Sequence, residues 1–336
     1  MAFILYIGNK LNSKGSNPTT IDTLGKQLTD EHYVVKYAST YKNWLIRILD
    51  MLFSVIKYSF KIDYVLIDTY STFGFWYVLC TSQCCRLLKL KYIPILHGGN
   101  LPKRLKINPL LCNLIFKNSY CNVAPSAYLY DEFKKKFNNL VLIPNTINEN
   151  DYQFLLRNEI APKLLWVRAF DQTYNPEMAL YVLEKLQQSY PKATLCMVGP
   201  KKDESFERSK KLANELGLSV KFTGKLSKKE WIQLSKEFDF FINTTNFDNM
   251  PVSLIEAMSL GLVVVSTNVG GIPYLINHQE TGILVNKNDV DEMVFQISNL
   301  LNNSVLYQKI AHNAQLSASQ FYWGEVKYKW FEILKK

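Results

Sequence analysis

Short runs of hydrophobic residues alternate along most of the chain with longer segments in which hydrophobic residues recur every three or four positions. The short runs are rich in Val, Ile, Leu and aromatic residues, which is typical of strands. They predict strands at residues 3–7, 64–68, 92–97, 121–124, 140–143, 164–168, 194–198, 220–223, 238–243, 263–267 and 283–285. Continuous hydrophobic strands that alternate with amphipathic helices favour parallel sheets covered on both faces.

The segments between the predicted strands carry a helical pattern. Hydrophobic spacing predicts helices near residues 20–30, 44–60, 73–90, 176–189, 203–216, 227–237, 251–260 and 289–302. The aromatic run FYWGEVKYKWFEILKK at the end of the sequence is also compatible with a helix. Because a polar stretch near residues 145–162 separates two such series, the pattern predicts an α/β fold with two doubly wound parallel-sheet domains.

The segment WLIRILDMLFSVIKYSFK, residues 44–61, is the strongest candidate for contact with a membrane. Its charged and polar residues recur at spacings of three and four, which indicates an amphipathic helix and not a membrane span. Two interpretations stay open, a helix that packs on the core and a helix that lies in a membrane interface. The N-terminal sequence lacks a basic leader and a long hydrophobic run, so we do not expect a signal peptide.

Composition narrows the classes of protein that fit this pattern. The chain has 336 residues, of which 48% are hydrophobic, which suits two domains with sizeable cores. Its net charge of +10 favours anionic partners such as phosphorylated ligands or an anionic membrane. We do not expect nucleic acid as a partner, because the lysines form no stripe interleaved with aromatic residues. The six cysteines contain no C-x2-C pair, which argues against a zinc site and favours free thiols in a reducing cytoplasm.

Residues just after the predicted strands are candidates for a site, because doubly wound sheets bind ligands at the carboxyl ends of their strands. The loop after the first strand contains Gly8, Gly15 and Ser16 and could let the backbone approach a phosphate. It lacks the G-x-G-x-x-G fingerprint, so an ordinary loop is the alternative. His97 ends the third predicted strand before two glycines and could contact a sugar hydroxyl, or be a structural histidine.

The second half of the chain repeats this arrangement. Arg168 ends a predicted strand, where it could pair with a phosphate or with a neighbouring acid. Gly199 and Gly224 each end a later strand, and lysines follow both of them. Such turns could border a nucleotide base or add charge near phosphates, although lysines such as Lys225 could equally be solvated.

The stretch NFDNMPVSLIEAMSLG, residues 246–261, follows another predicted strand and has the features of a capped helix. Pro251 fits the first helical position, Asp248 or Asn249 can cap, and Gly261 ends the segment. Glu256 lies off the hydrophobic stripe of this helix and would be solvated if it were read alone. The free N–H groups of a helix start attract phosphate, whereas carboxylates beside it suit hydroxyl groups, so the stretch favours a nucleotide-sugar.

Residues 248–285, DNMPVSLIEAMSLGLVVVSTNVGGIPYLINHQETGILV, resemble the signature region of the family-four retaining glycosyltransferases. The family pattern is E-x7-E followed by A-M-x-x-G and a V-G-G-I-P loop. VLIPNTI at 141–147, WVRAF at 166–170 and the C-terminal aromatic run resemble further segments of that family. The resemblance implies a GT-B fold, with two Rossmann-like domains facing across a cleft.

By position, the resemblance implies that Glu256 holds the ribose hydroxyls, that Asp248 faces the transferred sugar and that Arg168 balances the diphosphate. His97 matches a histidine near the reacting sugar and the acceptor. Further nucleotide-sugar contacts are implied for Gly15, Ser16, Gly199, Gly224, Lys225, Asn249, Met250, Pro251 and Val252. The sequence departs from the family where Asp248 replaces a glutamate and where residues 173–175 lack a lysine.

These implications define residues 1–155 as an acceptor-binding domain, onto which a helix at 320–336 packs back, and residues 156–319 as a nucleotide-sugar-binding domain. We expect a retaining, metal-independent glycosyltransferase that moves a hexose-type sugar from a nucleoside diphosphate sugar to a saccharide or lipid-linked acceptor. The pathway expected is bacterial-type surface polysaccharide or glycolipid assembly, in the cytoplasm with peripheral contact to an anionic membrane, and without a cofactor. The alternatives are a catalytically degenerate nucleotide-sugar-binding subunit and a nucleotide-sugar epimerase of similar fold.

Overall fold

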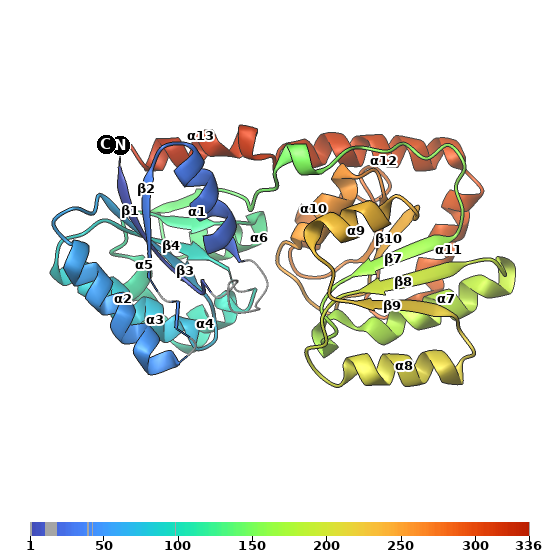
Figure 1. The fold of residues 1–336 in the computed structure, drawn as a ribbon, viewed down its shortest axis with the longest axis horizontal. Coiled ribbons are helices and arrows are strands. Elements are labelled where there is room, and N and C mark those ends of the chain that lie inside the picture. The colour runs from blue at the N-terminus through green and yellow to red at the C-terminus, as the bar shows by residue number, and fades with distance from the viewer. Residues whose placement is uncertain (1, 11–18, 39, 42, 98, 336) are drawn as a thin grey trace. The chain divides into compact units, whose positions relative to one another are not determined.

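The computed structural model describes residues 2–10, 19–38, 40–41, 43–97 and 99–335. The chain divides into two compact units, unit 1 with Met1–Thr146 and Val326–Lys336, and unit 2 with Ile147–Glu325. Each unit contains a six-stranded parallel sheet flanked by helices (Figure 1). The predicted fold class, two doubly wound parallel sheets, is therefore confirmed.

The sheet of unit 1 has the strand order β2-β1-β3-β4-β5-β6. Its strands are β1 (Phe3–Ile7), β2 (Val34–Ala38), β3 (Tyr64–Thr69), β4 (Tyr92–Leu96), β5 (Asn122–Ala124) and β6 (Leu140–Leu142). Its helices are α1 (Thr20–Asp30), α2 (Trp44–Tyr58), α3 (Gly74–Leu87), α4 (Leu101–Ile107), α5 (Pro109–Phe116) and α6 (Ala127–Lys134). Helices α2 to α6 share one hydrophobic core with the sheet.

The last helix, α13 (Trp323–Ile333), continues into the C-terminal segment of unit 1. Lys327 Nζ lies 3.0 Å from Glu31 Oε1, and the ring of Phe331 lies 6.1 Å from that of Tyr33. The hydroxyl of Tyr64 on β3 donates to the backbone carbonyl of Lys335. The end of the chain is thus held by two parts of unit 1, the connection between α1 and β2 and the strand β3.

The sheet of unit 2 has the strand order β12-β11-β10-β7-β8-β9. Its strands are β7 (Lys163–Val167), β8 (Thr194–Val198), β9 (Val220–Gly224), β10 (Phe240–Asn243), β11 (Val263–Thr267) and β12 (Ile283–Val285). Its α-helices are α7 (Pro176–Ser189), α8 (Ser205–Glu215), α9 (Lys228–Ser235), α10 (Val252–Ser259), α11 (Val290–Leu301) and α12 (Ser304–Ser319). If β7 is numbered as strand 1 and the sheet is read from β9 to β12, the order is 3-2-1-4-5-6, which is that of a dinucleotide-binding sheet.

Several elements were not predicted from the hydrophobic pattern. Strand β2 lies at the edge of its sheet and is only partly buried, so its sequence VVKYA carries a weak strand signal. Helices α4, α5 and α6 have only seven or eight residues each. Helix α12 buries a stripe made largely of alanines, Ala311, Ala314 and Ala318, which are too small to mark a hydrophobic face. In the part of the chain described here, no helix is long and hydrophobic enough to cross a membrane.

A buried arginine joins the elements of unit 2 that carry the candidate site. Arg157 lies in the loop before β7 and is 7% exposed. Its guanidinium donates to the carbonyls of Phe238 and Leu155 at 2.7 Å, and to those of Leu260 and Ser235 at 3.1 Å. The carbonyl of Leu155 lies in the same loop as Arg157. The other three lie at the end of α9, just before β10 and at the end of α10, so one side chain holds the ends of three elements.

We expect Arg157→Ala to lower the free energy of unfolding by roughly 3–5 kcal/mol, because it leaves buried carbonyls and the carboxylate of Asp239 without their cation. Urea unfolding monitored by circular dichroism measures the loss. Arg208→Ala is the matched control, because Arg208 pairs with Glu177 on the exposed surface and should have little effect. Equal losses in the two variants would contradict the bracing role of Arg157.

Candidate active site

The polar residues of unit 2 gather where the strand order reverses. β7 pairs with β8 on one side and with β10 on the other, so the sheet switches direction between β7 and β10. Arg168 directly follows β7, and Asp248 lies in the loop between β10 and α10. Doubly wound sheets bind ligands at this point, outside the carboxyl ends of the strands.

Arg168 and Asp248 form an ion pair at this switch point, between Nη2 and Oδ2. The side chains are 14% and 17% exposed, so the pair is only slightly open to solvent. The guanidinium of Arg168 also lies 4.7 Å from the ring centre of Tyr174, a cation–π contact. Its buried Nε has no hydrogen-bond partner among the described residues. The structure therefore shows Arg168 paired with a neighbouring acid, which is one of the two interpretations of this residue. The guanidinium still has N–H donors that could bind an anion.

The loop that carries Asp248 is held by the glycines of the V-G-G-I-P segment. The backbone carbonyl of Asp248 accepts a hydrogen bond from the N–H of Gly271 at 2.9 Å. Gly270 has φ +58°, and a Cβ on it would lie only 2.0 Å from the same carbonyl oxygen. Glycine at 270 therefore permits both the left-handed backbone and the close approach to Asp248.

Helix α10 begins one residue later than the sequence predicts. Pro251 is the N-cap and Val252 the first helical residue, and the side chain of the N-cap residue makes no capping hydrogen bond. Asn249 and Pro251 are buried, whereas Met250 and Val252 are half-buried. The N–H of Asn249 donates to Oδ1 of Asp248 at 2.7 Å, and Pro251 has no N–H. The N–H groups of Met250 and Val252 therefore remain as the donors of this turn for an anion, as expected at a helix start. Gly261 ends the segment with φ +79°, as the sequence indicates.

Glu256 is buried at 7% exposure, which corrects the expectation of a solvated glutamate when the helix is read alone. The cause is that residues 254–259 are buried all round the helix, which packs against β11 and α12. Its Oε1 accepts the hydroxyl of Tyr152 at 2.5 Å and lies 2.9 Å from Lys228 Nζ. Burial, and then the charge of Glu256, raises the pKa of Tyr152. Among the described residues neither contact uses Oε2, which leaves this oxygen for a ligand.

Gly199 and Gly224 lie at the ends of β8 and β9. A Cβ on Gly199 would lie 1.6 Å from the carbonyl oxygen of Arg168, so this glycine lets two strand ends approach closely. The N–H of Gly199 donates to the carbonyl of Gly224 at 2.9 Å. Lys225 is exposed beside them. The structure thus brings both glycines to the strand edge that carries Arg168.

Two further lysines near these glycines are engaged by local acids. Lys201 Nζ lies 2.7 Å from Glu207 Oε1, and Lys202 Nζ lies 2.6 Å from Asp171 Oδ2. The hydrogen bond with Asp171 raises the pKa of Lys202. Lys201 is therefore paired on the exposed surface.

Unit 1 has its own polar cluster at the switch between β1 and β3. His97 follows β4, and its Nε2 lies 2.8 Å from Oδ1 of Asp68, near the end of β3. The hydroxyl of Tyr6 donates to the same oxygen at 3.0 Å, and the ring of Tyr70 stacks 5.3 Å from the imidazole. Burial raises the pKa of both tyrosine hydroxyls, so they remain neutral donors. Asp68 was missed in the sequence, although an acid that ends the run YVLID could have signalled it.

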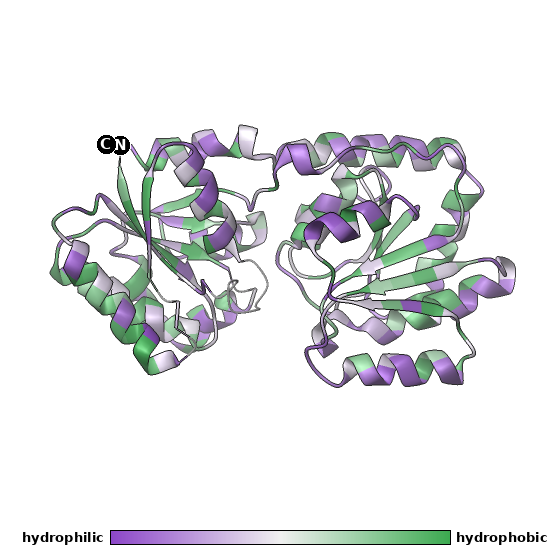
Figure 2. Ribbon diagram, in the orientation of Figure 1, coloured by the Kyte–Doolittle hydropathy of each residue, from purple (hydrophilic) through white to green (hydrophobic). Residues whose placement is uncertain are grey.

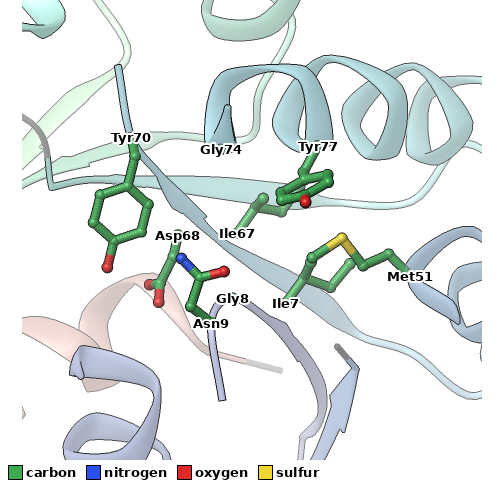
Figure 3. Close-up of a pocket in the computed structure, with 9 residues that line it drawn as sticks. All are labelled: Ile7, Gly8, Asn9, Met51, Ile67, Asp68, Tyr70, Gly74 and Tyr77. Atoms are coloured by element: carbon green, nitrogen blue, oxygen red, sulfur yellow. The ribbon is translucent and has the colours of Figure 1, made fainter. Parts of the chain in front are cut away.

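A small pocket opens beside Asp68, with the side chains of Asn9, Asp68 and Tyr70 toward one side and those of Met51 and Tyr77 toward the other (Figure 3). Oδ2 of Asp68 is buried and has no hydrogen-bond partner among the described residues. A hydroxyl donor of a ligand would satisfy this oxygen. Gly15 and Ser16, also expected at this strand edge, lie outside the described residues. Within the described part of the chain no group of three metal-ligating side chains occurs.

The chain has two doubly wound units, and unit 2 carries an arginine, two carboxylates and a helix start at one edge of its sheet. This combination defines an α/β protein of the GT-B class. Residues 148–317 match the family described as glycosyl transferases group 1. The match spans half of the 336 residues and includes Arg168, Asp248 and Glu256. The chain therefore belongs to this family, and the resemblance read from the sequence is confirmed.

Individual proteins similar to this chain have low sequence identity to it. An uncharacterized glycosyltransferase of Haemophilus influenzae is 29% identical over 209 residues, which cover 60% of this chain and 56% of that relative. The chain thus matches little more than half the length of this relative. Sucrose-phosphate synthase from Thermosynechococcus elongatus is 15% identical with a TM-score of 0.80, covering 99% of this chain and 98% of that one. The HepE protein of Anabaena in complex with UDP-glucose is 17% identical with a TM-score of 0.78, covering 99% of both chains.

The packing of Gly270 against Asp248 can be tested with a matched pair of variants. Gly270→Ala and Gly217→Ala both place a side chain at positive φ, but a Cβ on Gly217 meets nothing within 4 Å. We expect Gly270→Ala to cost roughly 1–3 kcal/mol more than Gly217→Ala, because its Cβ must displace the Asp248 carbonyl. Urea unfolding of both variants measures the difference, and equal losses would show that the loop tolerates a side chain at 270.

Proposed function

We propose that this chain is a retaining, metal-independent glycosyltransferase that moves a hexose-type sugar from a nucleoside diphosphate sugar to an acceptor hydroxyl. The observation that carries the proposal is the juxtaposition of Arg168, Asp248 and the start of α10 at the switch point of unit 2. Family membership supports the class of reaction. The donor would bind to unit 2 and the acceptor to unit 1.

The donor diphosphate would be held by the turn from Asn249 to Val252, through the N–H groups of Met250 and Val252, and by Arg168. Arginine has five N–H donors, of which one is used for Asp248, so others can reach phosphate oxygens. The charge that develops on the leaving diphosphate would be stabilised electrostatically by these groups. They would also have to serve in place of the lysine that the family carries and this chain lacks at residues 173–175.

Glu256 would accept the ribose hydroxyls through Oε2, while Tyr152 and Lys228 hold Oε1. Gly199, Gly224 and Lys225 would border the base. The HepE structure contains UDP-glucose, which makes UDP-sugars the first donors to test.

The acceptor hydroxyl would contact the cluster of His97, Asp68 and Tyr70 in unit 1. Asp68 would be a positioning residue, because its contact with Nε2 leaves Nδ1 of His97 for a substrate. The acceptor would be a saccharide or a lipid-linked saccharide of surface polysaccharide or glycolipid assembly. A cytoplasmic location would give the enzyme access to nucleotide-sugars.

We expect Arg168→Ala to lower kcat/KM for sugar transfer roughly 100-fold or more, because it removes a charge opposite the leaving group. Glu256→Gln should lower it roughly 10- to 100-fold, by weakening charge-assisted hydrogen bonds to the ribose. The assay follows nucleoside diphosphate release and glycosylated product with UDP-, GDP- and ADP-sugars. Arg208→Ala and Glu237→Gln are the controls, because both side chains are exposed and should leave the rates unchanged.

A thermal-shift measurement with the same donors separates binding from catalysis. Stabilisation by a nucleotide-sugar without product would favour a degenerate binding subunit, and a changed sugar without acceptor would favour an epimerase. If no nucleotide-sugar stabilises the chain, or if both variants transfer sugar at the original rate, the proposed donor site is wrong.

Asp68→Asn should lower acceptor-dependent transfer roughly 10- to 100-fold, because the neutral amide no longer holds the histidine as a carboxylate does. Donor affinity, measured by calorimetry, should stay unchanged because the donor would bind to unit 2. Asp30→Asn, an exposed acid of the same unit, is the control. Recovery of kcat in Asp68→Glu would support a positioning role, whereas an equal loss of donor affinity would contradict it.

A further inference from the structure

Helix α2 exposes a hydrophobic stripe along the side that faces away from the core. The exposed side chains recur at spacings of four, four, three and four, which places them on one side of the helix. They are Leu45, Leu49, Phe53 and Ile56 on α2 and Phe60 two residues beyond its end, with exposures between 51% and 102%. The opposite side buries Met51 and Val55 in the core of unit 1. Of the two interpretations that the sequence leaves open, packing on the core is observed for one side of the helix, while the other side is exposed.

The neighbouring helices extend this exposed hydrophobic surface. Helix α3 packs against both α2 and α5 in one layer of unit 1. Hydrophobic, green stretches of these helices are interrupted by hydrophilic, purple ones in Figure 2. Large exposed hydrophobic residues of α3, of α5 and of the end of α4 include Trp76, Leu87, Ile107, Leu110 and Leu114. A set of this size on one layer marks an interaction surface more often than chance exposure does.

The charge of the chain is concentrated in the same unit. Unit 1 contains 22 Lys and Arg against 9 Asp and Glu, a net charge of +13, whereas unit 2 contains 17 against 20, a net charge of −3. Residues 69–130, which include α3, α4 and α5, contain seven basic residues and no Asp or Glu. The partner that complements this layer is therefore both hydrophobic and anionic.

Basic side chains lie next to the stripe itself. Lys57 and Lys61 are exposed at the C-terminal end of α2, and Lys57 Nζ lies 6.0 Å from the ring centre of Phe53. Lysines beside hydrophobic residues can lay their methylene stems on an apolar phase and keep the ammonium at its surface. Trp44 and Trp76, both about half exposed, add the amphipathic rings typical of a membrane interface.

We propose that the exposed face of α2, together with α3 and α5, docks on an anionic lipid bilayer with α2 parallel to the membrane plane. The helix has 15 residues and is about 22 Å long, shorter than the hydrocarbon core of about 30 Å. A second copy of this chain is a poorer partner, because a symmetric dimer would bring two strongly basic surfaces together. The bilayer satisfies both the hydrophobic stripe and the charge.

The docked helix would also bring the pocket of unit 1 close to the lipid surface. Met51, on the inner side of α2, lines that pocket. Since a helix is about 10–12 Å thick, the pocket would lie about that far from the membrane. This consequence, which rests on the proposed function, suits an acceptor carried on a lipid.

Vesicle binding tests the proposal without any assay of sugar transfer. The full chain is sedimented with sucrose-loaded vesicles of phosphatidylcholine alone and of phosphatidylcholine with 30% phosphatidylglycerol. We expect binding to the anionic vesicles and much weaker binding to the neutral ones. The triple variant Leu49→Ser, Phe53→Ser, Ile56→Ser should bind at least 10-fold more weakly, and Lys57→Gln and Lys61→Gln about fivefold each.

The matched control is Phe295→Ser, Val305→Ser, Leu316→Ser, which removes three exposed hydrophobic side chains from unit 2. It should bind vesicles as the original chain does, and thermal unfolding should show that both triple variants remain folded. The proposal is overturned if the original chain does not bind anionic vesicles or if both triple variants lose binding equally. It is also overturned if the original chain is a dimer that ignores vesicles and becomes a monomer in the α2 variant.

Discussion

The parallel pairing of β7 with β10 decides where the polar residues of unit 2 meet. Phe240 lies opposite Leu164 and Phe241 opposite Leu165, so the two strands end at the same edge of the sheet. The strands are far apart in the sequence, yet the loops that follow them become neighbours at the switch point. The ion pair of Arg168 with Asp248 follows from this register. Gly199 and Gly270 permit close packing at these strand ends, whereas Arg157 holds the start of β10 at the opposite edge of the sheet.

The burial of Glu256 is difficult to explain by stability alone. Removing a carboxylate from water is costly, and a buried ion pair is often no more stable than a hydrophobic replacement. Tyr152 and Lys228 offset part of that cost, but the side chains around α10 are otherwise hydrophobic. A buried acid held from one side, with its other oxygen unused by the described residues, is more simply explained as a binding group.

The sequence predicts the fold well and the contacts of the site poorly, for a physical reason. Strand and helix patterns are local, so the continuous hydrophobic strands and the glycine stop at Gly261 can be read directly. The partners of the candidate site are distant: Tyr152 lies 104 positions from Glu256, and Arg168 lies 80 from Asp248. No periodicity encodes such pairs. The burial of Glu256 likewise depends on α12, whose small alanines carry almost no pattern of their own.

Asp248 marks the departure from the family's glutamate, and its contacts indicate what the shorter side chain does. Oδ2 pairs with Arg168, and Oδ1 accepts the N–H of Asn249 at 2.7 Å, so both oxygens are engaged at the loop itself. A glutamate would carry its carboxylate about one bond, roughly 1.5 Å, farther from this amide. The aspartate therefore fixes the guanidinium of Arg168 and the turn before α10. Under the proposed function, the donor sugar would be recognised mainly by that turn and by the arginine, and less by a carboxylate extended toward the substrate.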